Sequence, residues 1–120
     1  MDIVTATLII AMVLFHIYAF VLEVFLWQTP RAFKAFGTTK ATAASSQALA
    51  VNQGVYNLFL AGGLVWALLS TDPVAFQAKI FFLVCIIIAA VTAGVTVSKR
   101  IMIIQGAPAL LALLLVIFSR

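Results

Sequence analysis

Residues 80–91 read IFFLVCIIIAAV, twelve consecutive positions without a charge, an amide or a hydroxyl. They belong to a longer apolar stretch, residues 76–97, which matches the ~20 residues that a helix needs to cross the hydrocarbon core of a bilayer. Three further stretches of this kind cover residues 3–27, 47–69 and 101–118. Short connections make successive helices antiparallel neighbours. The sequence therefore predicts an all-α integral membrane protein, an up-down bundle of four transmembrane helices forming a single domain over residues 1–120.

The composition agrees with a membrane protein and excludes several other classes. Of the 120 residues, 66% are hydrophobic and 8% are charged, whereas soluble domains are usually about 25% charged. Four spans leave no room for a soluble catalytic domain. The net charge of +4 comes from scattered basic residues, so we expect membrane lipids as partners and no nucleic acid. The lone Cys85 cannot form an intrachain disulfide.

Basic residues are unevenly divided between the predicted connections. The stretch from 28 to 46 and the link from 98 to 100 together carry five of them, whereas the opposite face has two, Lys79 and Arg120. Because cytoplasmic loops are enriched in Lys and Arg, we expect both basic connections in the cytoplasm and both termini outside it, in a multi-pass protein of the cell membrane. The five basic residues are Arg31, Lys34, Lys40, Lys99 and Arg100.

Two of the connections contain helix-capping signals. Residues 28–46 include Pro30 and Gly37 and many Thr, Ala and Ser residues, so we expect a loop with a short interfacial helix that carries Phe33 and Phe36. The sequence Thr71-Asp72-Pro73 predicts a tight turn in which Thr71 or Asp72 caps the next helix and Pro73 lies in its first turn.

The first predicted span contains two ionisable residues, His16 and Glu23. An acidic residue at bilayer depth costs ~2.5–3.5 kcal/mol on insertion scales. Seven residues make almost two helical turns, so both side chains share one face with a rise of ~10.5 Å between them. This distance is too long for a direct hydrogen bond and leaves room for a ligand. Phe20 and Trp27 fall in the same stripe.

The second predicted span supplies amides that can satisfy these groups. Gln53 and Asn57 are neighbours on one face of the helix, and Asn52 and Tyr56 form a second pair about 100° away. Gly54 allows a backbone or a ligand to come close. Antiparallel packing leads us to expect Glu23 opposite Asn52 and Gln53, and the deeper His16 opposite Asn57 or the residues beyond it.

We predict a ligand-binding site from these two spans, without a metal or a cofactor and without assigned catalytic residues. The alternative is that the polar side chains serve only as hydrogen bonds between helices, which average ~0.6 kcal/mol in membranes. Gln105, with Gly106 and Pro108, can complete the site from the fourth span or lie at the interface. The predicted ligand-binding residues are His16, Glu23, Trp27, Asn52, Gln53, Tyr56 and Asn57.

The run from Ala50 to Ala61 contains the segment N-Q-G-V-Y-N, residues 52–57. This segment resembles a family of small bacterial and fungal membrane proteins, the domain of unknown function thirteen-zero-four. The upstream residues agree with the same pattern: His16, Glu23, Trp27, Thr29-Pro30-Arg31 and Phe36-Gly37. The resemblance is strongest up to Leu64. It implies four helices and a membrane location, and it brings no established activity.

Three functions fit these residues. In the first, a small molecule is bound or transported in a proton-linked way, with Glu23 as the coupling group, His16 tuning it, and at least a homodimer forming the pathway. In the second, an intramembrane isomerase-like enzyme uses His16 and Glu23 as acid and base on a lipid or isoprenoid substrate. In the third, the chain is a structural or accessory subunit whose polar cluster fixes helix register.

Overall fold

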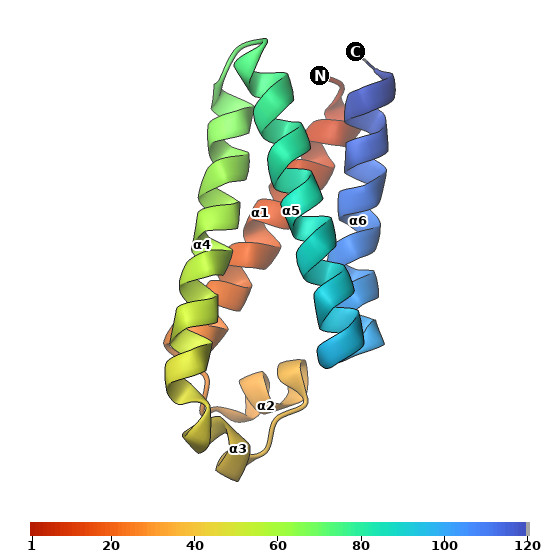
Figure 1. Ribbon diagram of the computed structural model, residues 1–120. Helices are drawn as coiled ribbons and strands as arrows, with labels where there is room; N and C mark the ends of the chain where they lie inside the picture. The colour runs from red at the N-terminus through yellow and green to blue at the C-terminus, as the bar shows by residue number, and fades with distance from the viewer. Residues whose placement is uncertain (120) are drawn as a thin grey trace. The chain divides into compact units, whose positions relative to one another are not determined.

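The computed structural model describes residues 1–119, which form six α-helices and no β-strand (Figure 1). The all-α prediction is confirmed for these residues. Four helices are long: α1 (Ile3–Val24), α4 (Gln47–Leu69), α5 (Val74–Thr96) and α6 (Lys99–Phe118). Two are short, α2 (Pro30–Phe36) and α3 (Lys40–Ser45), and they follow α1 in the chain. Arg120, one of the two basic residues assigned to the outer face, lies outside the described residues.

The four long helices contain 20 to 23 residues each and are apolar enough to cross a membrane. At ~1.5 Å per residue each reaches about 30–35 Å, the thickness of the hydrocarbon core. The chain thus has the helices of a multi-pass membrane protein. Large apolar side chains remain exposed, including Ile3, Leu69 and Val95, as lipid contact requires. Insertion and the up-down order stay predictions.

Helix α1 ends three residues earlier than the predicted boundary at Trp27. Residues 25–29 form turns, in which the Thr29 N–H and hydroxyl both donate to the Leu26 carbonyl. Thr29 then caps α2, because its hydroxyl accepts the Ala32 N–H and Pro30 follows as the first helical residue. A proline disfavours helical backbone at the residue before it. Pro30 therefore accounts for the extended backbone of Thr29, and α1 itself ends earlier, at Val24.

The other helix ends follow from local caps. Asp2 accepts the Thr5 N–H at 2.7 Å, and this hydrogen bond lowers the pKa of the exposed Asp2 carboxyl. The Asp72 carboxylate accepts the Phe76 N–H, as a capping residue does, but Pro73 occupies the N-cap position and the first turn begins at Val74. Ser98 caps α6 through the Arg100 N–H, so α6 begins at Lys99, two residues before the predicted start.

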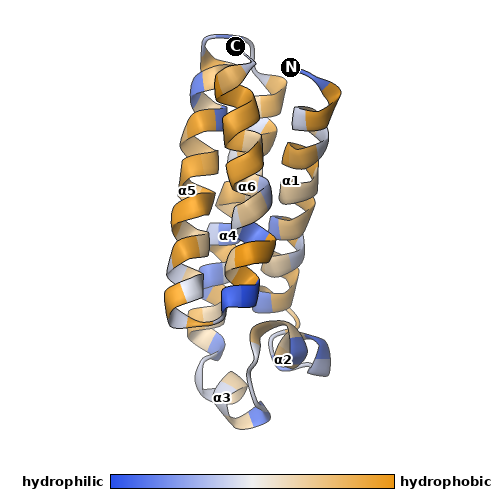
Figure 2. Ribbon diagram, turned by 90° about the vertical axis from the view of Figure 1, so that its right-hand side faces the viewer, coloured by the Kyte–Doolittle hydropathy of each residue, from blue (hydrophilic) through white to orange (hydrophobic). Residues whose placement is uncertain are grey.

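The chain divides into two compact units. The first unit comprises Met1–Leu14 and the chain from Leu60 onward, and the second comprises Phe15–Phe59. In the first unit all four long helices contribute to one apolar core, and α5 and α6 lie side by side with hydrophobic residues along most of their length (Figures 1 and 2). Its buried members are Ile9, Met12, Val13, Ala61, Leu64, Leu83, Ile86, Ala109, Ala112 and Val116.

Small residues permit close helix contacts in the first unit, as is common between membrane helices. A Cβ atom added at Gly63 would meet the ring of Phe82, and one added at Gly106 would lie 3.0 Å from the Ala90 Cβ. A Cβ added at the neighbouring Gly62 would meet no described atom within 4 Å. The two adjacent glycines of α4 therefore have different roles, since only Gly63 packs against another helix.

We expect Gly62→Ala and Gly63→Ala to affect stability differently. Alanine improves helix propensity by ~0.5–1 kcal/mol at both positions. At Gly63 overpacking against Phe82 costs about 1–3 kcal/mol, so Gly63→Ala should be the less stable variant by that amount. Reversible unfolding in detergent, followed by circular dichroism, measures the difference. Equal stability of the two variants would contradict the proposed helix contact.

Candidate functional site

The second unit contains a folded connection between α1 and α4, made of α2 and α3. Gly37, with φ 68°, ends α2, and Thr39 and Thr42 form a reciprocal capping box at the start of α3. The predicted helix with Phe33 and Phe36 is present as α2, and α3 is an additional helix where a loop is predicted. Both short helices pack their apolar residues into a small core, made of Leu22, Trp27, Phe33, Phe36, Ala32, Ala43 and Ala50.

Trp27 belongs to this small core. Its ring is buried, lies 5.1 Å from the ring of Phe36, and donates its Nε1–H to the Ser46 hydroxyl at 3.2 Å. The Gln28 amide donates to Gln47 at 2.9 Å beside it. The predicted stripe of α1 does not continue to Trp27, because the helix has already ended at Val24. The indole instead anchors the connection against the start of α4.

Glu23 and Asn57 are brought together within the second unit. The Asn57 Nδ2 donates to the Glu23 Oε1 at 2.5 Å, and the Glu23 side chain is 7% exposed. The same Nδ2 lies 3.4 Å from the carbonyl oxygen of Gln53, one turn earlier on α4. A buried carboxylate is costly unless it is hydrogen-bonded. The amide therefore meets the one acidic side chain of α1 and joins α1 to α4.

Gly54 allows α1 and α4 to approach at this point. A Cβ atom added there would lie 2.6 Å from the Val24 Cγ2, 3.1 Å from the Glu23 Cβ and 3.3 Å from the Phe20 carbonyl oxygen. The backbone of α4 thus packs directly on the turn of α1 that carries Glu23. The expectation that Gly54 permits a close backbone approach is confirmed.

The register differs from the predicted one, in which Glu23 faced Asn52 and Gln53. Glu23 pairs with Asn57, about one turn further along α4. Gln28 meets Gln47, and from there α4 rises ~15 Å over ten residues to Asn57. On the α1 side, residues 25–29 are turns and lie between Glu23 and Gln28.

His16 is fully buried and makes an edge-on contact with the ring of Phe15, with centroids 5.2 Å apart. It lies two turns before Glu23 on α1. Of its two predicted positions, Asn57 is bonded to Glu23, and the position opposite residues beyond Asn57 stays a prediction. A role for His16 in the site stays a prediction.

Three predicted site residues of α4 have exposed side chains: Asn52, Gln53 and Tyr56. The Tyr56 ring contacts Phe59, one turn further on, with centroids 6.1 Å apart. Gln105 is buried in the first unit. The structure therefore brings Glu23, Gly54 and Asn57 together and leaves the other amides of α4 available on the surface. Ser46, the partner of Trp27, was missed because hydroxyl residues in a Thr/Ser-rich connection give no individual signal.

The pair of Glu23 and Asn57 offers one carboxylate and one amide in apolar surroundings. A carboxylate there can hold a proton or a cation, because either one neutralises a charge that the interior disfavours. Within residues 1–119, no three His, Cys, Asp and Glu side chains gather as ligands for a metal ion. The chemistry that these residues support is exchange of a proton or a cation.

A family model described as "Protein of unknown function (DUF1304)" matches residues 10–117. The chain belongs to this family. The match includes all seven predicted site residues and both short helices. No curated protein and no solved structure matches the chain. The membership agrees with the resemblance drawn from the sequence, and the N-Q-G-x-Y-N segment as a marker of DUF1304 proteins stays a prediction.

We expect Gly54→Ala to destabilise this DUF1304 protein. The new methyl group would overlap Val24 and press on the backbone oxygen of Phe20, which cannot rotate away. Overpacking of this kind costs about 1–3 kcal/mol. Unfolding in detergent, with Gly62→Ala of the same helix as the control, measures the loss. A Gly54→Ala protein as stable as the control would refute the close contact between α1 and α4.

Proposed function

We propose that this DUF1304 protein binds and transports a small lipophilic cation in exchange for a proton, with Glu23 as the exchange group. The observation that supports the proposal is the buried carboxylate of Glu23, which accepts a hydrogen bond from Asn57 on a helix long enough to cross a membrane. Ionisable residues in such helices commonly mark ion and substrate pathways.

Magnitudes favour this function over a structural role. A charged acidic residue at bilayer depth costs ~2.5–3.5 kcal/mol, whereas hydrogen bonds between membrane helices average ~0.6 kcal/mol. One amide does not offset the cost of the charge. A glutamine would join α1 to α4 with a similar hydrogen bond and without any charge. A carboxylate is useful when the site must be neutralised by a proton in one state and by a cation in another.

The surroundings of Glu23 favour a lipophilic cation. Phe20, Glu23 and Val24 belong to one turn of α1, and Gly54 brings the backbone of α4 against this turn. An apolar body can contact these groups while its positive charge meets the carboxylate. Proton and cation then compete for the same oxygen atoms, which gives an exchange of one for one. In this proposal His16 tunes the site from two turns away.

The exposed amides of α4 extend the proposal to a homodimer. One chain of four spans offers a single buried carboxylate and few helices to enclose a pathway. Asn52, Gln53 and Tyr56 are exposed on α4, and amides on a membrane helix can hydrogen-bond across to another helix. We place these residues at the contact with a second copy or with the polar part of the ligand.

We also propose a location in the cell membrane with both termini outside the cytoplasm. The residues that support this orientation are Arg31, Lys34 and Lys40 in the connection after α1 and Lys99 and Arg100 at the start of α6.

Single cysteines test the orientation. Cys85→Ala removes the native thiol, and Ala41→Cys or Thr71→Cys then adds one exposed thiol, in α3 or in the α4–α5 turn. We expect a membrane-impermeant maleimide, applied outside intact cells, to label Thr71→Cys and to spare Ala41→Cys until the cells are opened. Early labelling of Ala41→Cys with protection of Thr71→Cys would reverse the assignment.

Glu23→Gln tests the exchange function, because glutamine keeps an acceptor for Asn57 but takes up no proton. The probes are tetraphenylphosphonium and ethidium, titrated calorimetrically into the purified full chain in buffers of different ionisation enthalpy. We expect the wild type to release up to one proton per cation and to bind more weakly as the pH falls. Glu23→Gln should release none and bind about ten-fold more weakly, as after loss of a charged contact.

Asp2→Asn is the matched control, since it removes an exposed carboxylate and asparagine caps a helix as well as aspartate does. It should bind and release protons as the wild type does. The exchange function is wrong if the wild type releases no proton with either cation. It is also wrong if Glu23→Gln changes only the unfolding temperature, which is the result of a purely structural role.

A further inference from the structure

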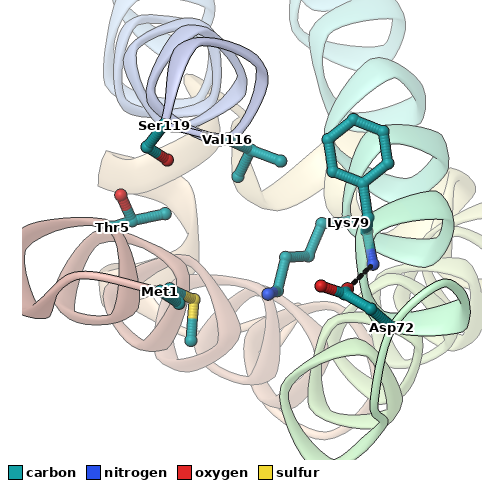
Figure 3. A pocket seen from close by; sticks show the side chains of 7 residues that line it. Met1, Thr5, Asp72, Lys79, Val116 and Ser119 are labelled. Carbon is teal, nitrogen blue, oxygen red and sulfur yellow. Dashed lines mark hydrogen bonds between the residues drawn. The ribbon is translucent and has the colours of Figure 1, made fainter.

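A second polar cluster lies in the first unit, at the ends of its helices. A cavity of ≈ 90 Å³ is lined there by residues from the start of α1, the α4–α5 turn, α5 and the end of α6 (Figure 3). None of these residues belongs to the unit that contains Glu23. The lining residues are Met1, Thr5, Asp72, Phe76, Lys79, Val116 and Ser119.

Lys79 supplies the positive charge of this cavity. It lies in the second turn of α5, is 9% exposed, and directs its ammonium group into the cavity (Figure 3). Within residues 1–119 its Nζ has no hydrogen-bond or ion-pair partner. Lysine is almost never this buried unless it is paired. Lys79 lies within the stretch 76–97 that the sequence predicts as a membrane helix, and its charge entered only the orientation prediction.

Thr5 supplies a second unused polar group. Its side chain is 1% exposed, and its Oγ1 has no hydrogen-bond partner within the described residues. Its backbone N–H is bonded to Asp2, and its side chain also helps to lower the pKa of the Asp2 carboxyl. A buried hydroxyl without a partner is destabilising. The Thr5 hydroxyl and the Lys79 ammonium group come from different helices and line the same cavity.

The exposed rim of the cavity adds a negative charge. Asp72 lies in the α4–α5 turn, and one of its oxygens accepts the Phe76 N–H at 3.2 Å. Its carboxylate faces the cavity from the side of Lys79 (Figure 3). Ser119 lies just beyond α6, and its hydroxyl donates to the Leu115 carbonyl. The cavity therefore combines two hydrogen-bond donors, the Lys79 ammonium and the Thr5 hydroxyl, with the Asp72 carboxylate at its exposed edge.

We propose that this cavity binds the headgroup of a zwitterionic phospholipid, phosphoethanolamine. The phosphodiester accepts hydrogen bonds from the Lys79 ammonium and the Thr5 hydroxyl, and the ethanolamine ammonium meets the Asp72 carboxylate. Because Asp72 opposes a second negative charge, a singly charged phosphodiester fits better than a free phosphate dianion. All the polar groups lie near helix ends, which is the depth of lipid headgroups for helices of this length.

Lys79→Met tests the site, because methionine keeps the apolar stem and removes the charge. Native mass spectrometry of the full chain in detergent measures binding of phosphatidylethanolamine, phosphatidylglycerol, phosphatidylcholine and inorganic phosphate. We expect the wild type to prefer phosphatidylethanolamine and Lys79→Met to bind it about ten-fold more weakly. Lys99→Met, which removes the same charge at an exposed position of the same unit, should bind it as the wild type does.

Thr5→Val provides a second readout, since valine has nearly the same shape and lacks the hydroxyl. In lipid-free detergent we expect Thr5→Val to raise the unfolding temperature, because it removes an unpartnered polar group, while it weakens phosphatidylethanolamine binding about three-fold or more. A structural hydroxyl would instead give a lower unfolding temperature and unchanged lipid binding. Thr5→Val also serves as the test if Lys79→Met does not fold.

Three results would overturn the proposal. Lys79→Met could bind phosphatidylethanolamine with unchanged affinity, or the wild-type protein could prefer phosphatidylglycerol. Inorganic phosphate could also compete completely, which would assign the site to a free anion. Asp72→Asn should remove the preference for phosphatidylethanolamine over phosphatidylglycerol. Cation exchange at Glu23 is measured with different probes and variants, so either proposal can fail without the other.

Discussion

Close contact between α1 and α4 at Gly54 determines where the polar groups of the second unit lie. The glycine brings the α4 backbone against the turn of α1 that contains Phe20, Glu23 and Val24. Only at this separation can the short side chain of Asn57 reach the Glu23 carboxylate. A larger residue at position 54 would separate the helices and leave a buried acid without its donor, which is more costly than the loss of an ordinary hydrogen bond.

The connection between α1 and α4 maintains the same contact from one end. Trp27, buried against Phe36 and bonded to Ser46, ties the end of α1 to the start of α4. Caps at Thr29 and Thr39 allow two short helices to form within a connection of fewer than twenty-five residues. This connection is therefore a structural element, and the tryptophan that it buries has a packing role whatever its part in the site.

The two polar sites differ in how many hydrogen-bond partners the protein itself supplies. Glu23 accepts a hydrogen bond from an amide on the neighbouring helix, and in the proposed exchange a proton or a cation neutralises its charge. The Thr5 hydroxyl has no hydrogen-bond partner in the described chain, and the buried Lys79 lines the same cavity. Their cavity at the helix ends is therefore suited to a ligand that remains bound, such as a lipid. The proposed exchange at Glu23 needs a ligand that binds and leaves, whereas the proposed lipid in the Lys79 cavity stays bound.

Apolar runs such as residues 80–91 determined the four long helices by themselves, because a stretch of ~20 apolar residues has few alternatives to a membrane helix. The sequence also identified Glu23 and Asn57 as candidates, since ionisable and amide residues stand out in apolar spans. Only the tertiary structure decided that they pair. The register depends on where α1 ends and on the turns formed by residues 25–29, and hydrophobic periodicity contains no information on either. Burial of Lys79 and Thr5 was likewise decided by packing, because one charge near a helix end looks the same in sequence whether it faces water or a cavity.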